Sequence, residues 1–226
     1  MSDISRMAMV AALLGEPARA NMLAALLDGR ALTAKELAFA AHVTAPTASE
    51  HLARLTDTGL LTAEKQGRHR YFRLASQLVG QMMESIMAVA GPEPLPVARW
   101  RGGEALRIAR TCYDHLAGRL GVALADSLLG AGHVTLTVDG GEVTPSGHAF
   151  LADFGAEPEP GKRVFCRPCL DWSERRPHIA GRLGAALATR CLALGWVTRL
   201  PDTRAVAITP AGASGFATMF GIRLEG

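Results

Sequence analysis

The fold is decided by the stretch PTASEHLARLTDTGLLTAEKQGRHRYFRL, residues 46–74. Its first part has helical spacing, because Ala48, Leu52 and Leu55 recur on one side and polar residues remain for the other. Gly59 follows, and glycine readily takes the left-handed conformation that ends a helix. The pattern therefore predicts a helix with one buried face that stops at about residue 58.

A basic hairpin is predicted directly after this helix. Residues 60–64 and 71–74 have strand character, and the residues 65–70 that join them include a lysine, two arginines and a histidine. Taken alone, such a turn is more often simply a solvated, charged loop. Its position behind the helix makes a nucleic-acid contact the sharper hypothesis.

A second helix is predicted immediately upstream. Thr33 and Glu36 have the spacing of a capping box, in which each side chain accepts a hydrogen bond from the other residue's backbone amide. After a short break, Thr44 is a good cap and Pro46 suits the first turn of the next helix. The sequence thus predicts a helix, a tight turn and a second helix, followed by the basic hairpin.

In this order the chain resembles the ArsR/SmtB family of winged-helix transcriptional regulators, over about residues 5–90. The resemblance is carried by Leu23, Leu26, Leu27 and Leu37 and by residues 46–55, 58–61 and 67–74. It implies a sequence-specific DNA-binding regulator, most simply a repressor. It also implies a homodimer that places two recognition helices in successive major grooves of a pseudo-palindromic, double-stranded operator.

The same resemblance implies which residues contact DNA. On the recognition helix they are Thr44, Thr47, Ser49, His51 and Arg54, and on the wing they are Lys65, Arg68, His69 and Arg70. The alternatives are plain helix surface for Thr47 and Ser49, and a packing role for His51. Ala45 and Glu50 depart from the family pattern, so the operator sequence cannot be transferred from relatives.

A fifth helix is predicted over residues 76–90, and it is rich in methionine and other apolar residues. Such a stripe exceeds what a small winged helix can bury alone, which favours a dimer interface. Metal-sensing members of the family carry ligands on this helix or on the one before the recognition helix. This helix offers one acid, Glu84, and the earlier positions hold alanines, so the family's usual arsenic and zinc sites are excluded.

The proline-rich residues 91–99 predict a linker between a DNA-binding domain, residues 1–90, and a C-terminal domain, residues 100–226. Hydrophobic residues make up 49% and charged residues 20% of the 226, which favours globular domains over disorder or a rod. The formal net charge is only +3, so the basic charge that matters is local to the wing. No apolar stretch reaches the length of a bilayer span, and a cytoplasmic protein is expected.

The C-terminal domain contains an internal repeat. His115-Leu116-Ala117-Gly118-Arg119-Leu120-Gly121 returns as His178-Ile179-Ala180-Gly181-Arg182-Leu183-Gly184. Each copy reads as a helix, a β-hairpin and a Thr-Pro helix start, which is winged-helix-like. The expected fold class is mainly α with small β-hairpins (α+β), with a winged helix-turn-helix and two winged-helix-like repeats. The second domain is expected to sense an effector or to brace a dimer.

Four residues of this half form a candidate metal site: Cys112, His115, Cys169 and His178. Residues 101–129 have helical spacing, which predicts a continuous helix that carries Cys112 and His115. The repeat places the two histidines at equivalent positions. Thiolates and imidazoles suit zinc or another soft metal ion. The alternatives are buried core residues, or a thiol oxidation switch at Cys166 and Cys169.

Two further uses of this region are compatible with the sequence. An organic effector pocket could have walls from Trp100, Tyr113 and Trp172 and a carboxylate clamp from Arg182 or a neighbouring arginine. An enzyme could use Cys112, His115 and Asp171 as nucleophile, base and orienter, although the sequence has no established catalytic motif. The sequence therefore favours a regulator without enzymatic activity, with an effector that is a metal ion or a small molecule.

Overall fold

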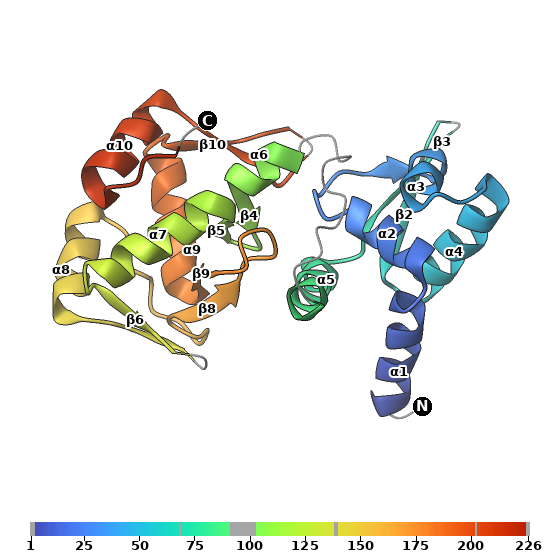
Figure 1. Cartoon of the computed structure of the whole chain (residues 1–226), viewed down its shortest axis with the longest axis horizontal. Coiled ribbons are helices and arrows are strands. Elements are labelled where there is room, and N and C mark those ends of the chain that lie inside the picture. The colour runs from blue at the N-terminus through green and yellow to red at the C-terminus, as the bar shows by residue number, and fades with distance from the viewer. Residues whose placement is uncertain (1–2, 68, 91–102, 138–139, 202, 225–226) are drawn as a thin grey trace. The chain divides into compact units, whose positions relative to one another are not determined.

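A computed structural model describes residues 3–67, 69–90, 103–137, 140–201 and 203–224 (Figure 1). The chain divides into two compact units, Met1–Met83 and Glu84–Gly226, and the boundary falls within helix α5. The predicted linker, residues 91–99, lies outside the described residues. Among the described residues no helix is both long and apolar enough to cross a bilayer.

The first unit is a winged helix. Its elements are α1 (Asp3–Leu14), α2 (Pro17–Ala25), β1 (Leu32–Thr33), α3 (Ala34–Ala41), α4 (Ala45–Asp57), β2 (Leu61–Gln66), β3 (His69–Leu74) and the start of α5 (Gln77–Val89). The strands form one antiparallel sheet in the order β1-β3-β2. Strand β1 was not predicted, because two residues are too short to show a pattern.

The predicted helix-turn-helix is present as α3 and α4 (Figure 1), and both helices have their predicted caps. Thr33 and Glu36 form the capping box of α3, and Thr44 caps α4 by accepting from the Thr47 amide. His42 ends α3 in the left-handed conformation, with φ 56°. The inward-facing Leu52 and Leu55 are buried as predicted.

The second unit contains the repeat. Its first copy is β4 (Arg110–Cys112), β5 (His115–Ala117), α7 (Gly118–Gly130), β6 (Val134–Leu136), β7 (Gly141–Val143) and α8 (Pro145–Phe154). Its second copy is β8 (Arg167–Leu170), β9 (Pro177–Ala180), α9 (Gly181–Ala193), β10 (Val197–Arg199), β11 (Val206–Ile208) and α10 (Pro210–Phe220). A short helix, α6 (Gly103–Ile108), precedes the first copy.

The prediction of continuous helical structure from residue 101 to residue 129 was wrong. The hairpin β4–β5 interrupts it, with a turn at Tyr113, where φ is 61°. Both strands are buried along their whole length, so they lack the alternation that identifies a half-exposed strand. Each repeat is therefore hairpin, helix, hairpin, helix rather than helix, hairpin, helix.

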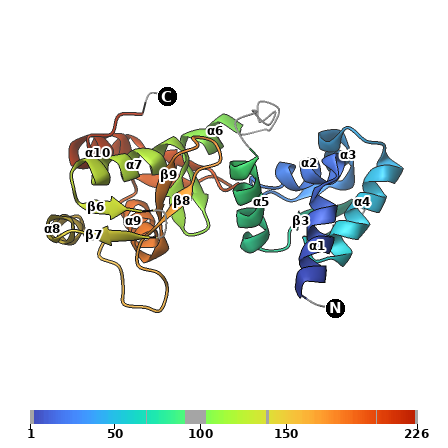
Figure 2. The ribbon, with the colours of Figure 1, turned by 60° about the horizontal axis from the view of Figure 1, so that its bottom comes forward.

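Each copy packs its central helix against a strand of the other copy. Helix α7 packs on β9 of the second copy, and α9 packs on β5 of the first. Strands β5 and β9 are also neighbours, and Figure 2 shows β6 and β7 beside α8. One continuous apolar cluster includes Leu120 and Leu183 from the two copies. This reciprocal packing brings the leading hairpins of the repeats together.

Candidate metal centre and nucleic-acid interface

The outer face of α4 and the wing are open to solvent. The exposed members of the predicted DNA-contacting set are Thr44, Ser49, Arg54, Lys65, His69 and Arg70. Arg68 lies outside the described residues, and Thr47 is half-buried. The guanidinium of Arg70 lies over the Phe72 ring, 5.3 Å from its centroid, so the wing strand itself supports this cation.

The hydroxyl groups near the start of α4 are also used within the helix. Thr44 Oγ1 and Thr47 Oγ1 lie 2.9 Å apart, and Ser49 Oγ donates to the carbonyl of Ala45 at 3.0 Å. These bonds fix the side chains at the N-terminal end of α4. They leave a compact polar surface at the N-terminal end of α4.

His51 differs from the other predicted contacts, because it is half-buried. Its Nδ1 is 3.3 Å from a guanidinium nitrogen of Arg19, and its Nε2 is 3.6 Å from Oε2 of Glu16. Arg19 is buried and also donates to the carbonyl of Leu13 at 2.7 Å. His51 therefore links α4 to the start of α2, which agrees with the packing alternative for this residue, although its partners Arg19 and Glu16 were not predicted.

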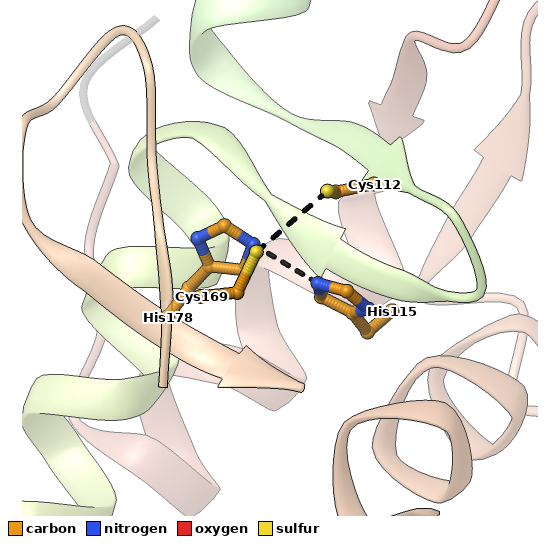
Figure 3. Close-up of side chains that lie close together, drawn as sticks. All are labelled: Cys112, His115, Cys169 and His178. Atoms are coloured by element: carbon orange, nitrogen blue, oxygen red, sulfur yellow. Dashed lines mark hydrogen bonds between the residues drawn. The ribbon is translucent and has the colours of Figure 1, made fainter. Parts of the chain in front are cut away.

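The structure brings Cys112, His115, Cys169 and His178 together (Figure 3). Their ligand atoms all lie within 4.8 Å of one another. The two sulfurs are 4.0 Å apart, and the two histidine Nε2 atoms are 3.1 Å apart. Three of the four residues are buried, and Cys169 is half-buried.

Two hairpins, and no helix, position these side chains. Cys112 faces His115 across β4–β5, and Cys169 faces His178 across β8–β9. The prediction that Cys112 and His115 share a helix was therefore wrong. They still lie on the same side, because directly opposite residues in an antiparallel pair project to the same face.

The two thiols of the cluster have opposite pKa shifts. A hydrogen bond to Cys169, together with burial, raises the pKa of Cys112 to about 12, whereas the same hydrogen bond lowers the pKa of Cys169. Cys166 and Cys191 lie outside the cluster, and burial raises the pKa of Cys166 to about 11 and that of Cys191 to about 12.

Asp171 lies beside the cluster, next to His178. Its Oδ2 accepts from Arg110 at 2.8 Å and from the Gly118 amide at 2.7 Å, and it lies 3.6 Å from Nδ1 of His178. Burial alone would raise the pKa of Asp171, but the Arg110 charge and the Ser173 hydroxyl hold it well below its usual value. Asp171 is therefore a buried carboxylate in its charged form. The sequence did not indicate Arg110, which precedes Asp171 by 61 positions.

Glu84 also reaches the cluster. Its Oε2 lies 3.3 Å from Cys112 Sγ, and its Oε1 accepts from Arg204 at 2.8 Å. In the second unit Arg175 also donates to the carbonyl of Met87, at 2.7 Å. Glu84 thus connects the C-terminal half of α5 to the cluster. Glu84 is the one acidic residue in this apolar helix, and that was the sequence feature that could have indicated its role.

The described residues of the predicted organic effector pocket have other contacts in the structure. Trp172 is buried beneath Arg110, Tyr113 is exposed and lies under Arg163, and Arg182 donates to the carbonyls of Glu159 and Arg163. Trp100 lies outside the described residues. A different cavity of about 480 Å³ lies between α6, β11 and α10, and its lining is mostly apolar.

The catalytic alternative finds little support in this geometry. Asp171 approaches His178 rather than His115, so the proposed orienter does not contact the proposed base. The raised pKa of Cys112 is opposite to what an activated nucleophile requires.

Comparison with known proteins identifies the family. The chain is 40% identical over 221 residues to the uncharacterized HTH-type transcriptional regulator YdfF of Bacillus subtilis, covering 96% of this chain and 98% of that protein. The chain belongs to the HTH-type transcriptional regulators. A family model described as MarR family matches residues 16–70 of this regulator, which span its helix-turn-helix. ArsR and MarR are two family names for winged helix-turn-helix regulators, so this match agrees with the predicted fold and DNA-binding function.

Other relatives match the first part of this HTH-type regulator. It is 31% identical over 110 residues to the HTH-type regulator CmtR of Mycobacterium bovis, covering 46% of this chain and 91% of CmtR. Two solved structures give TM-scores of 0.36 and 0.33. The first is a homodimeric winged helix-turn-helix DNA-binding domain from M. bovis, which is 27% identical and covers 40% of this chain and 87% of that chain. The second is the cadmium sensor CmtR from M. tuberculosis, which is 28% identical and covers 39% of this chain and 92% of that chain.

Proposed function

We propose that this DNA-binding regulator acts as a cytoplasmic homodimer on a pseudo-palindromic operator, as a repressor and without enzymatic activity. The observation that carries the proposal is the joint exposure of the polar end of α4 and the basic wing. Thr44 and Ser49 supply hydrogen-bonding groups for base edges and phosphates, and Lys65 and Arg70 supply charge for the backbone.

Exposed apolar side chains support the dimer. Helix α1 buries none of its residues, and Ile4 and Met7 are 74% and 67% exposed. Leu78 and Val89 of α5 are 73% and 89% exposed. Large apolar side chains exposed on helices are typical of surfaces that a second copy covers.

The wing is tested by gel shift on an operator selected from a random DNA library. We expect Lys65→Ala with Arg70→Ala to weaken binding to all sequences and to reduce its salt dependence by about one counterion for each lost contact. Arg199→Ala, on the β10–β11 hairpin, is the matched control and leaves binding unchanged. Equal affinity of the wing variant and the wild type would refute the wing assignment.

A second function, response to a soft metal ion, is favoured by the Cys112, His115, Cys169 and His178 cluster. In this proposal the domain of residues 100–226 is the sensor. Glu84 provides the route, because it contacts Cys112 and belongs to α5, which continues into the winged-helix unit. If the metal binds more tightly to a conformation in which α5 is repositioned, it would favour that conformation and so change operator affinity.

Elemental analysis and gel shifts before and after chelation test this response. We expect copurified or added metal to change operator affinity, and a chelator to reverse the change. The contrary outcome is an operator affinity that does not change with metal but changes with oxidant, together with a Cys112–Cys169 disulfide detected by mass spectrometry. That outcome would replace metal sensing with thiol sensing.

A further inference from the structure

The candidate metal site is divided equally between the two repeats. Cys112 and His115 are cross-strand partners in β4–β5, and Cys169 and His178 are cross-strand partners in β8–β9. Each histidine lies three residues before the helix start of its copy, at Gly118 and Gly181, whereas Cys169 lies further from its helix start than Cys112 because the turn of β8–β9 is longer; each cysteine is nevertheless directly opposite its histidine. One repeat thus supplies one sulfur and one imidazole.

The distances fit one ion at the centre of a tetrahedron. With metal–sulfur bonds of about 2.3 Å and metal–nitrogen bonds of about 2.0 Å, a tetrahedral zinc ion holds its two sulfurs about 3.8 Å apart and its two nitrogens about 3.3 Å apart. The observed separations are 4.0 Å for Cys112 and Cys169 and 3.1 Å for His115 and His178.

The carboxylates near the histidines favour a cation between them. Nδ1 of His115 is 3.4 Å from Asp114, and Nδ1 of His178 is 3.6 Å from Asp171. A carboxylate beside Nδ1 favours a proton there and leaves Nε2 as a lone-pair donor to metal. The two Nε2 atoms, 3.1 Å apart, share one proton in a hydrogen bond in the metal-free chain, and a metal ion would take the place of that proton.

Glycines of α7 and α9 make room for the histidines. A Cβ atom on Gly184 of α9 would lie 3.0 Å from Cβ of His115, and one on Gly121 of α7 would lie 3.5 Å from Cβ of His178. Each histidine therefore sits against the helix of the other repeat. The same reciprocal packing that forms the apolar core also fixes the directions of the ligands.

We propose that these four residues hold one divalent metal ion per chain in a tetrahedral site, of the class that zinc, cadmium and cobalt represent. We also propose that Asp171 is a positioning residue for His178. This inference rests on the proposed metal response. Two thiolates and two imidazoles match zinc, cadmium and cobalt, whereas the hard ions magnesium and calcium take oxygen ligands. On binding, Cys112 and Cys169 each give up a proton to solvent and become thiolate ligands, and the proton shared by the two Nε2 atoms also leaves.

The test is a cobalt titration of the full-length, metal-free chain. We expect one equivalent of Co²⁺ to give the visible bands of tetrahedral cobalt and a sulfur-to-metal charge-transfer band, and zinc to abolish both. Cys112→Ser and Cys169→Ser should lose the charge-transfer intensity of one sulfur each. Cys166→Ser and Cys191→Ser are matched controls, because these buried cysteines lie outside the cluster, and they retain the full spectrum.

X-ray absorption of the zinc-loaded wild type removes any dependence on variants that fold poorly. Two sulfurs at about 2.3 Å and two nitrogens at about 2.0 Å are expected. Ligation by oxygen and nitrogen only, or no binding, would overturn the site.

Asp171→Asn tests the positioning role. Loss of an outer-shell partner typically weakens metal binding 10- to 100-fold, so we expect a fall of about that size with the tetrahedral spectrum retained. Unchanged affinity in a folded variant, checked by circular dichroism, would refute the role.

Gel shifts separate this inference from the proposed function. A tetrahedral site that leaves operator affinity unchanged would make the ion structural and end the sensing proposal. No metal binding, together with operator binding, would end the site and leave the DNA-binding function intact.

Discussion

At the scale of single residues, Asp171 organises the second unit. It is fully buried, and its two oxygens accept hydrogen bonds from Arg110, the Gly118 amide and Ser173. These groups come from a strand, a helix start and a turn that are distant in sequence. Removing the carboxylate would leave the Arg110 charge buried without its partner, which is far more costly than losing an exposed ion pair.

We expect Asp171→Ala to lower the free energy of unfolding of the metal-free second unit by about 3 to 5 kcal/mol. The control is Asp126→Ala, which breaks the solvent-exposed pair with Arg176 and should cost about 0 to 1 kcal/mol. Urea unfolding followed by tryptophan fluorescence reports both values, since Trp172 and Trp196 lie in this unit. Similar losses in the two variants would contradict the role of Asp171.

At the scale of elements, caps were predictable and buried hairpins were not. Thr33, Thr44, Thr144 and Thr209 each begin a helix as predicted, because a capping hydroxyl and a nearby proline or glutamate are local signals. The hairpin β4–β5 gave no signal, because its strands are short and buried throughout. The proximity of His115 and His178 was predictable from the repeat, but the support of the cluster by Arg110 and Asp171 depends on contacts between distant segments.

The close contact between α9 and the β5 strand yields a second prediction. Gly184→Ala places a methyl group against the carbonyl oxygen of Ile179 and near His115, so it should cost about 1 to 3 kcal/mol and weaken cobalt binding. Gly130→Ala, at the open end of α7, is the control and should be neutral or slightly stabilising. Denaturant unfolding and cobalt titration measure the two effects, and identical behaviour of both variants would argue against the packing.

Helix α5 carries a third prediction. Glu84→Gln keeps the size of the side chain but removes the charge that faces Cys112 and Arg204. We expect the variant to form the tetrahedral cobalt site and to bind the operator, but with a smaller change in operator affinity on metal addition. Glu104→Gln, at an exposed pair with Arg119, is the control. A full metal response in Glu84→Gln would exclude this route.

At the scale of the whole molecule, an ion held by both repeats should stabilise one unit selectively. Free zinc at about 1,000 times its dissociation constant raises the free energy of unfolding by about 4 kcal/mol for a unit that binds the ion only in its folded state. We expect hydrogen exchange to slow in β4, β5, β8 and β9 and to remain unchanged in α3 and α4. Equal protection across Met1–Met83 would show that the ion acts elsewhere.

The equal division of the four ligands also bears on the ancestry of the chain. The leading hairpin of each repeat has one thiol and one imidazole, too few to enclose an ion, whereas the two hairpins together have four ligand atoms. A gene encoding one repeat would therefore have depended on self-association to complete the site. Fusion of two copies would make that pairing permanent and free each half to diverge, as the longer loop with Asp171 in the second copy already has.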